Sequence, residues 1–204
     1  RLAEVFSWQT VMSAEGLLLL IGGILWILFG KERVNQEQSN NSLGLKDIWV
    51  ILRSRITILM IIADAGPFAC YIAFSAWLPT YYHELFDMSL TEAGTIIGFA
   101  PLIGGFCLIF GEWLHHRRFS RKQMFIITGL AIPLFGFGSI TFESVLLLYL
   151  CVLGLGAFSW LYIPFLMTIP TEQEKATQAH VAITWALLTG VGAVIAFVAP
   201  LSVG

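Results

Sequence analysis

The chain has 204 residues, of which 57% are hydrophobic and only 12% are charged. A soluble domain carries about 25% charged residues, so this composition excludes an ordinary water-soluble fold. The net charge of -2 says little about partners, and the positions of the charges along the chain are more informative. Cys70, Cys107 and Cys151 all lie in apolar stretches, where we expect small packing residues rather than disulfides or metal ligands.

Six stretches are apolar over the roughly 17 to 25 residues that a membrane-spanning helix needs. They cover residues 10–29, 56–82, 93–114, 124–141, 145–169 and 176–199. Barrel strands would alternate apolar and polar residues, whereas these stretches are continuously apolar. The sequence therefore predicts an all-α fold, a polytopic membrane helix bundle with six transmembrane helices surrounded by lipid. Glycine pairs four residues apart, such as Gly94 and Gly98, are expected to pack helices together.

The basic residues are confined to alternate connections between these stretches. Every Lys and Arg except Arg1 lies in residues 30–55, 115–122 or 170–175, and the connections around residues 83–91 and 142–144 contain none. Short cytoplasmic loops are enriched in Lys and Arg, and short translocated loops are not. We therefore expect the three basic segments to be cytoplasmic, and the protein to be integral and multi-pass in a bacterial inner membrane.

The first basic segment divides into two parts. Residues 32–42 are mostly polar and are typical of a flexible linker. In residues 45–55, apolar side chains recur at i, i+3, i+4 and i+7, namely Leu45, Ile48, Trp49 and Leu52. This spacing predicts either a short amphipathic helix on the inner membrane surface or a helical extension of the second span.

The second stretch carries the strongest candidate for chemistry, Asp64. It lies about eight residues, or roughly 12 Å, into the predicted helix. A carboxylate at that depth is costly unless it faces protein or water, which favours a proton-coupling or cation-binding role. The alternative is a structural carboxylate, either bonded to a neighbouring helix or near the membrane interface. Gly66 and Pro67 follow, and because proline removes a backbone hydrogen bond, we expect a hinge or helix break there.

Further candidates for substrate or coupling sites lie in the second, fifth and sixth stretches. Tyr71, Trp160 and Tyr162 lie deeper than the aromatic residues at the span ends, which are typical of the interfacial belt. His180 can change its charge near neutral pH, and Thr184 follows one turn later. The position of His180 near the membrane surface favours a structural role over a functional one.

The connection after the third stretch contains Glu112, His115 and His116, a spacing that zinc could use. Four basic residues follow and would repel a cation, so we predict a solvated loop and no metal: Arg117, Arg118, Arg121 and Lys122. The sequence has no nucleophilic elbow, phosphate-binding glycine loop or CxxC pair. We therefore expect no enzymatic activity, no cofactor and no nucleic-acid partner.

The order of spans, loops and charges resembles the major facilitator superfamily of secondary transporters over essentially the whole chain. Residues 7–9 (Ser-Trp-Gln) resemble the start of the family's sixth helix, and residues 76–82 the end of its seventh. Residues 87–94 are similar to the outer loop where the next helix restarts, with Ser89 or Thr91 as its N-cap and Glu92 in its first turn. The seventh-helix pattern is similar to nitrate/nitrite, cyanate and organic-anion permeases.

Residues 111–122 loosely match the glycine and basic signature of the family's cytoplasmic loops. The match rests on Gly111, Arg117, Arg118, Arg121 and Lys122. The acidic residue of the signature is absent, and Ser120 replaces its second glycine. A gating salt bridge of the family's type is therefore in doubt.

The resemblance implies that the chain spans the sixth to eleventh helices of the family. Residues 1–30 would be the last helix of the amino-terminal half, residues 31–55 the cytoplasmic linker with its amphipathic helix, and residues 56–204 most of the carboxyl-terminal bundle. The chain begins at Arg1 and stops just after a span, so we expect a fragment whose partner is the missing amino-terminal half. A complete six-span protein is the alternative.

A secondary transporter of this type would move a small solute by alternating access, through symport or antiport and with possible proton coupling. No arginine lies inside a span, so this half offers no fixed cation to an anionic solute. The alternatives are an integral-membrane enzyme and a scaffold or channel subunit. Neither a polar cluster with a nucleophile at one membrane face nor a filter loop is visible in the sequence.

Overall fold

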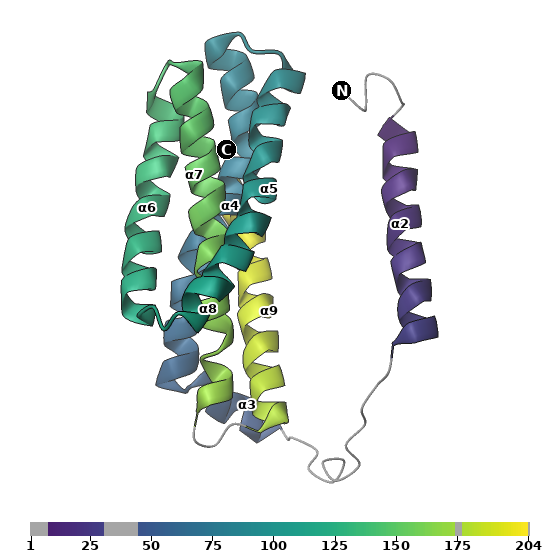
Figure 1. The fold of residues 1–204 in the computed structure, drawn as a ribbon, viewed down its shortest axis with the longest axis vertical. Coiled ribbons are helices and arrows are strands. Elements are labelled where there is room, and N and C mark those ends of the chain that lie inside the picture. The colour runs from purple at the N-terminus through teal and green to yellow at the C-terminus, as the bar shows by residue number, and fades with distance from the viewer. Residues whose placement is uncertain (1–7, 31–44, 174–176, 204) are drawn as a thin grey trace. The chain divides into compact units, whose positions relative to one another are not determined.

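The computed structural model describes residues 8–30, 45–173 and 177–203, which are helical apart from short connections (Figure 1). The predicted linker, residues 32–42, and Lys175 lie outside the described residues. The chain divides into two compact units, Arg1–Ser42 and Leu43–Gly204. The first contains helix α2 (Trp8–Phe29), whose large apolar side chains from Leu17 to Phe29 are 44–80% exposed. The described side chains of this helix therefore form no buried face.

The second unit is a bundle of long helices. It comprises α3 (Leu45–Leu52), α4 (Arg55–Phe86), α5 (Leu90–His116), α6 (Arg121–Thr141), α7 (Val145–Leu161), α8 (Ile163–Met167), the 3-10 helix η2 (Pro170–Glu172) and α9 (Gln178–Val203). With α2, and with α7 to η2 taken as one span, six helices are long and apolar enough to cross a membrane. Each starts and ends within four residues of its predicted bounds, so the six-span prediction is confirmed.

Local chemistry explains where several helices begin. The Ser89 hydroxyl accepts a hydrogen bond from the Glu92 backbone N–H at 3.1 Å, so Ser89 rather than Thr91 is the N-cap of α5. Ser54 is extended and separates α3 from α4. The short amphipathic helix is therefore distinct from the second span, and the alternative of a continuous extension is wrong. Its location on the membrane surface stays a prediction.

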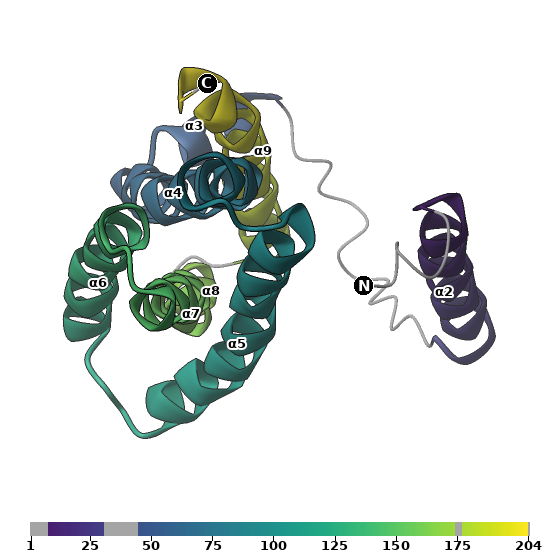
Figure 2. The ribbon, with the colours of Figure 1, turned by 90° about the horizontal axis from the view of Figure 1, so that it is seen from above.

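Within this unit α7 packs against α5 and α6, and α4 packs against α9 (Figure 2). The carboxyl-terminal end of α4 is fastened to two neighbours. The Trp77 indole N–H donates to the carbonyl of Pro200 in α9 at 2.8 Å. The hydroxyls of Tyr81 and Tyr82 donate to backbone carbonyls at the end of α6, each also at 2.8 Å.

The opposite end of the bundle holds the basic connection between α5 and α6. The Arg121 guanidinium donates to the Thr168 hydroxyl at 3.0 Å and to the Glu172 carboxylate, which joins the start of α6 to the end of the fifth span. The His115 ring lies 5.1 Å from the Phe165 ring. The orientation of this end toward the cytoplasm stays a prediction.

The contact between α5 and α7 depends on buried glycines. A Cβ atom added to Gly156 would stand 2.4 Å from the backbone carbonyl oxygen of Ala100, and one added to Gly111 would stand 2.5 Å from that of Leu161. Small residues allow such close approach, which matters in lipid because the hydrophobic effect no longer drives helices together. In contrast, a Cβ atom on Gly94 or Gly98 would meet no atom within 4 Å. The prediction that this pair packs helices together is wrong for the described bundle.

We expect Gly156→Ala to lower the stability of the bundle by about 1 to 3 kcal/mol, because the added methyl would collide with rigid backbone of α5. The measurement is the thermal unfolding midpoint in detergent. Gly129→Ala in α6 is the matched control, since its Cβ atom would have nothing within 4 Å. Equal midpoints for the two variants would contradict the close contact of α5 and α7.

Candidate functional site

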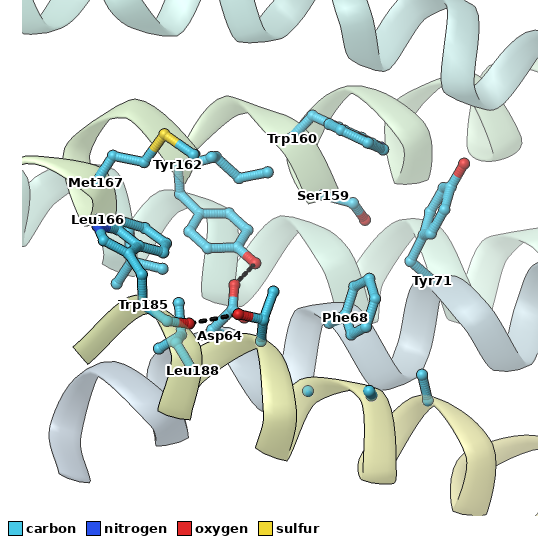
Figure 3. A pocket seen from close by; sticks show the side chains of 15 residues that line it. Asp64, Phe68, Tyr71, Ser159, Trp160, Tyr162, Leu166, Met167, Trp185 and Leu188 are labelled. Atoms are coloured by element: carbon cyan, nitrogen blue, oxygen red, sulfur yellow. Dashed lines mark hydrogen bonds between the residues drawn. The ribbon is translucent and has the colours of Figure 1, made fainter. Parts of the chain in front are cut away.

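A cavity of about 550 Å³ lies between α4, the α7–α8 segment and α9 (Figure 3). Most of its wall is apolar or aromatic. The lining residues are Asp64, Phe68 and Tyr71 from α4; Ser159, Trp160, Tyr162, Ile163, Leu166 and Met167 from the α7–α8 segment; and Trp185, Leu188, Thr189, Gly192, Ala193 and Ala196 from α9. Four of the predicted site residues therefore meet at one cavity: Asp64, Tyr71, Trp160 and Tyr162.

Helix α4 contributes one face to the cavity. Asp64, Phe68 and Tyr71 are spaced i, i+4 and i+7, which places them on the same side of a helix. The helix runs on without interruption through Gly66 and Pro67, and Gly66 is exposed with no atom within 4 Å of a Cβ position. A hinge at Gly66 and Pro67 stays a prediction, and these two residues do not line the cavity.

The fifth span is interrupted where it meets the cavity. Helix α7 ends at Leu161, α8 begins at Ile163, and Tyr162 lies between them. Pro164 has no backbone N–H, so it cannot donate to the carbonyl of Trp160 as a residue in a regular helix would. The sequence predicted one span over residues 145–169 without locating this interruption, and Pro164 was the signal that could have located it.

Tyr162, at this interruption, forms a hydrogen bond with Asp64 of α4. Its hydroxyl donates to Asp64 Oδ1 at 2.8 Å, and Tyr162 itself is only 2% exposed. The other carboxylate oxygen, Oδ2, lies toward α9, 4.0 Å from the Cβ position of Gly192. Asp64 is therefore bonded to a neighbouring helix and also faces the cavity, so the two interpretations of this residue are not mutually exclusive.

Aromatic rings form the wall beyond Asp64. The rings of Tyr71 and Trp160 meet edge to face, with centroids 6.1 Å apart. Trp160 lies against Gly104 of α5, where a Cβ atom would stand only 2.4 Å from the indole. Beside it, the buried Ser159 hydroxyl has no hydrogen-bond partner in the part of the chain that the structure describes. A bound solute could supply that partner.

Helix α9 presents a face of small and apolar residues that the sequence analysis missed. Trp185, Leu188, Thr189, Gly192 and Ala193 recur at i, i+3, i+4, i+7 and i+8. The Thr189 hydroxyl donates to the carbonyl of Trp185 within the same helix. The helical spacing of these residues was visible in the sequence, but nothing there identified α4 as the helix they oppose.

His180 and Thr184 do not line this cavity. Thr184 is fully buried, and its hydroxyl donates to the carbonyl of His180 at 2.9 Å. The backbone N–H of His180 donates to the Thr177 hydroxyl at 3.1 Å, which caps the start of α9. The structure therefore separates these two predicted residues from the Asp64 site.

The predicted loop motif is divided between several roles. Gly111 is buried inside α5 and lets α7 approach. Arg117 lies over the Trp113 ring at 5.2 Å, and Arg118 adopts a left-handed conformation with φ 60°. Lys122 is exposed on the surface. Arg121 donates hydrogen bonds to another span, through Thr168 and Glu172 as described above.

The three residues with metal-like spacing do not converge on one point. Glu112 Oε1 lies 3.1 Å from His116 Nε2 on the exposed face of α5, while His115 stacks edge-on against Phe165. Across residues 8–30, 45–173 and 177–203, no cluster of three or more His, Cys, Asp or Glu side chains could hold a metal ion.

Comparison with known proteins identifies the family. A profile described as Major Facilitator Superfamily matches residues 1–200. The uncharacterized protein Cj0987c of Campylobacter jejuni is 28% identical over 156 residues, which cover 74% of this chain and 48% of that protein. The probable nitrate/nitrite antiporter NarK1 of Thermus thermophilus is 29% identical over 119 residues, covering 57% of this chain and 26% of that protein. No solved structure matches the chain.

We expect the hydrogen bond between Tyr162 and Asp64 to stabilise the bundle by about 1 kcal/mol, a value typical of interhelical hydrogen bonds in membranes. A double-mutant cycle with Tyr162→Phe and Asp64→Leu, read from unfolding in detergent, measures this coupling. Tyr71→Phe combined with Asp64→Leu is the matched control and should show no coupling. Equal coupling for both tyrosines would contradict a specific bond to Tyr162.

Proposed function

The chain belongs to the major facilitator superfamily, and from this premise we propose that it forms part of a secondary transporter that moves a small solute by alternating access. It is an integral, multi-pass membrane protein. Both relatives come from bacteria, which supports a location in a bacterial inner membrane. The observation that carries the proposal is a membrane-embedded cavity with a carboxylate in its wall.

Several features of the cavity suit a solute site. It lies between separate spans rather than inside one helix, and its volume of about 550 Å³ is typical of pockets for small molecules. In transporters with repeated halves, the solute binds near the middle of the membrane where the halves meet. Because the matched regions span less than half of either relative, we propose that the described bundle supplies one wall and that a further part of the transporter supplies the other.

We propose that Asp64 couples transport to protons. A carboxylate in apolar surroundings is costly unless a positive charge or a hydrogen bond compensates it. Tyr162 provides one hydrogen bond to Asp64, and a proton or a cationic solute can compensate the remaining negative charge. Among the described lining residues the ionisable groups are Asp64, Tyr71 and Tyr162, and the lining face of α9 has none. Asp64 is therefore the group whose charge changes most readily.

Exchange of nitrate and nitrite is the second candidate, because one relative is named as a probable antiporter for these ions. Anions would need a positive side chain close to the binding position. None of the described residues that line the cavity is Lys, Arg or His. For this candidate to hold, the positive group would have to come from elsewhere in the transporter.

Alternating access predicts that the cavity wall can be reached from both sides of the membrane. We expect Ala193→Cys, in a background without other cysteines, to react with a membrane-impermeant maleimide in both right-side-out and inside-out vesicles. Leu130→Cys is the control, because Leu130 is a 70% exposed apolar residue of α6 that would face lipid and should react from neither side. Reaction of Ala193→Cys from one side only would contradict alternating access.

Proton coupling predicts that the pH of the medium shifts the balance between the two accessible states. We expect the ratio of outside to inside labelling at Ala193→Cys to change between acidic and alkaline buffers, because protonation removes the charge of Asp64. Asp64→Asn should fix the ratio at its acidic value, and Asp64→Glu should keep the pH response. An unchanged pH response in Asp64→Asn would remove this residue from the coupling step.

A further inference from the structure

We propose that the solute bound in this cavity is an apolar organic cation, with its positive group beside Asp64 and its apolar body among the aromatic rings. This inference rests on the proposed transport function and names the chemical class of the solute. It follows from the charge, the wall chemistry and the size of the cavity.

The charge balance of the cavity favours a cation. Asp64 is the one charged side chain among the described residues that line it. An anion would be repelled, and a neutral solute would leave the carboxylate with Tyr162 as its compensating partner. A monovalent cation neutralises the site. Gly192 presents no side chain to Asp64 Oδ2, which lies 4.0 Å from its Cβ position, and the positive group would approach the carboxylate from this side.

The wall of the cavity favours an organic cation over a metal ion. Calcium needs six to eight oxygen ligands, and magnesium requires an octahedral set. Five of the lining residues are instead aromatic: Phe68, Tyr71, Trp160, Tyr162 and Trp185. Figure 3 shows these rings on both sides of Asp64. Aromatic faces attract ammonium and similar cations, and this attraction strengthens when water is excluded.

The size of the cavity agrees with this assignment. A volume of about 550 Å³ accommodates a molecule of many heavy atoms, whereas a nitrate-sized ion would leave most of it unfilled. The α9 face, with Gly192, Ala193 and Ala196, keeps that volume free of protein side chains. The buried Ser159 hydroxyl offers one polar contact away from the carboxylate.

One consequence concerns how transport is coupled. The proton and the cation would compete for the same carboxylate, so binding of a monovalent cation releases one proton to water and leaves an ion pair in the cavity. The reverse step takes up one proton and releases the cation. Exchange of one proton for one monovalent cation moves no net charge.

The test uses two ions of nearly the same shape and opposite charge, tetraphenylphosphonium and tetraphenylborate. We expect the complete gene product in detergent to bind radiolabelled tetraphenylphosphonium with an affinity that falls as the pH is lowered, and not to bind tetraphenylborate. Asp64→Asn should weaken tetraphenylphosphonium binding at least about tenfold, and Asp64→Glu should largely preserve it. Equal binding of the two ions, or full affinity in Asp64→Asn, would overturn the proposal.

Three further variants separate charge from aromatic packing. Phe68→Leu keeps an apolar side chain but removes the ring, and should weaken tetraphenylphosphonium binding roughly two- to thirtyfold, while Phe68→Tyr should not. Glu143→Gln is the control for a carboxylate outside the cavity, since Glu143 is exposed in the connection between α6 and α7, and should bind normally. A loss of affinity in Glu143→Gln equal to that in Asp64→Asn would contradict a specific site at Asp64.

Protection of Ala193→Cys from maleimide distinguishes this inference from the proposed function. If Ala193→Cys reacts from both sides and tetraphenylphosphonium slows the reaction, both the transport function and the solute class are supported. If Ala193→Cys reacts from both sides but tetraphenylborate, and not tetraphenylphosphonium, slows the reaction, the solute class is overturned. The transport function then still holds. Labelling from one side overturns transport itself, and with it the solute assignment that rests on it.

Discussion

The contact on which the site depends is the close approach of α5 and α7. Lipid supplies no hydrophobic force between helices, so their association relies on small residues that let backbones meet. Gly156 and Gly111 allow that contact, and Gly104 makes room for the Trp160 indole. Tyr162 directly follows α7, and its hydroxyl donates to Asp64 on α4. The packing of the fifth span against α5 thus helps to fix the position of the Tyr162 hydroxyl beside Asp64.

The three elements around the cavity contribute different chemistry. Helix α4 supplies the carboxylate and two aromatic rings. The α7–α8 segment supplies the hydrogen-bond donor to that carboxylate and part of the apolar wall, and α9 supplies the rest of that wall, including small residues that keep the volume open. A carboxylate without a compensating partner inside a membrane span would destabilise the protein. Asp64 is instead held by a hydrogen bond from Tyr162, and in the proposed site a positive partner would stabilise its second oxygen.

Much of the fold was predictable because lipid imposes simple rules. Continuous apolar stretches gave six spans, and the hydroxyl of Ser89 marked the start of α5. Depth in the membrane singled out Asp64, Tyr71, Trp160 and Tyr162. The sequence could not show which helices would be neighbours, so it did not reveal the face of α9 or that His180 lies outside the lining of the cavity beside Asp64. Proximity along the chain also suggested packing for Gly94 and Gly98, where the described helices leave the space open.

The fastening of α4 at its far end has a mechanical consequence. The side chains of Trp77, Tyr81 and Tyr82 bind α4 to the ends of α9 and α6, so this end would be the fixed point if α4 were to tilt. Asp64 lies roughly 20 Å along the axis from Trp77, and a tilt of about 5° would displace it by roughly 2 Å. That shift is enough to break a hydrogen bond of 2.8 Å. A tilt of α4 by only a few degrees would therefore release the Tyr162 hydroxyl from Asp64.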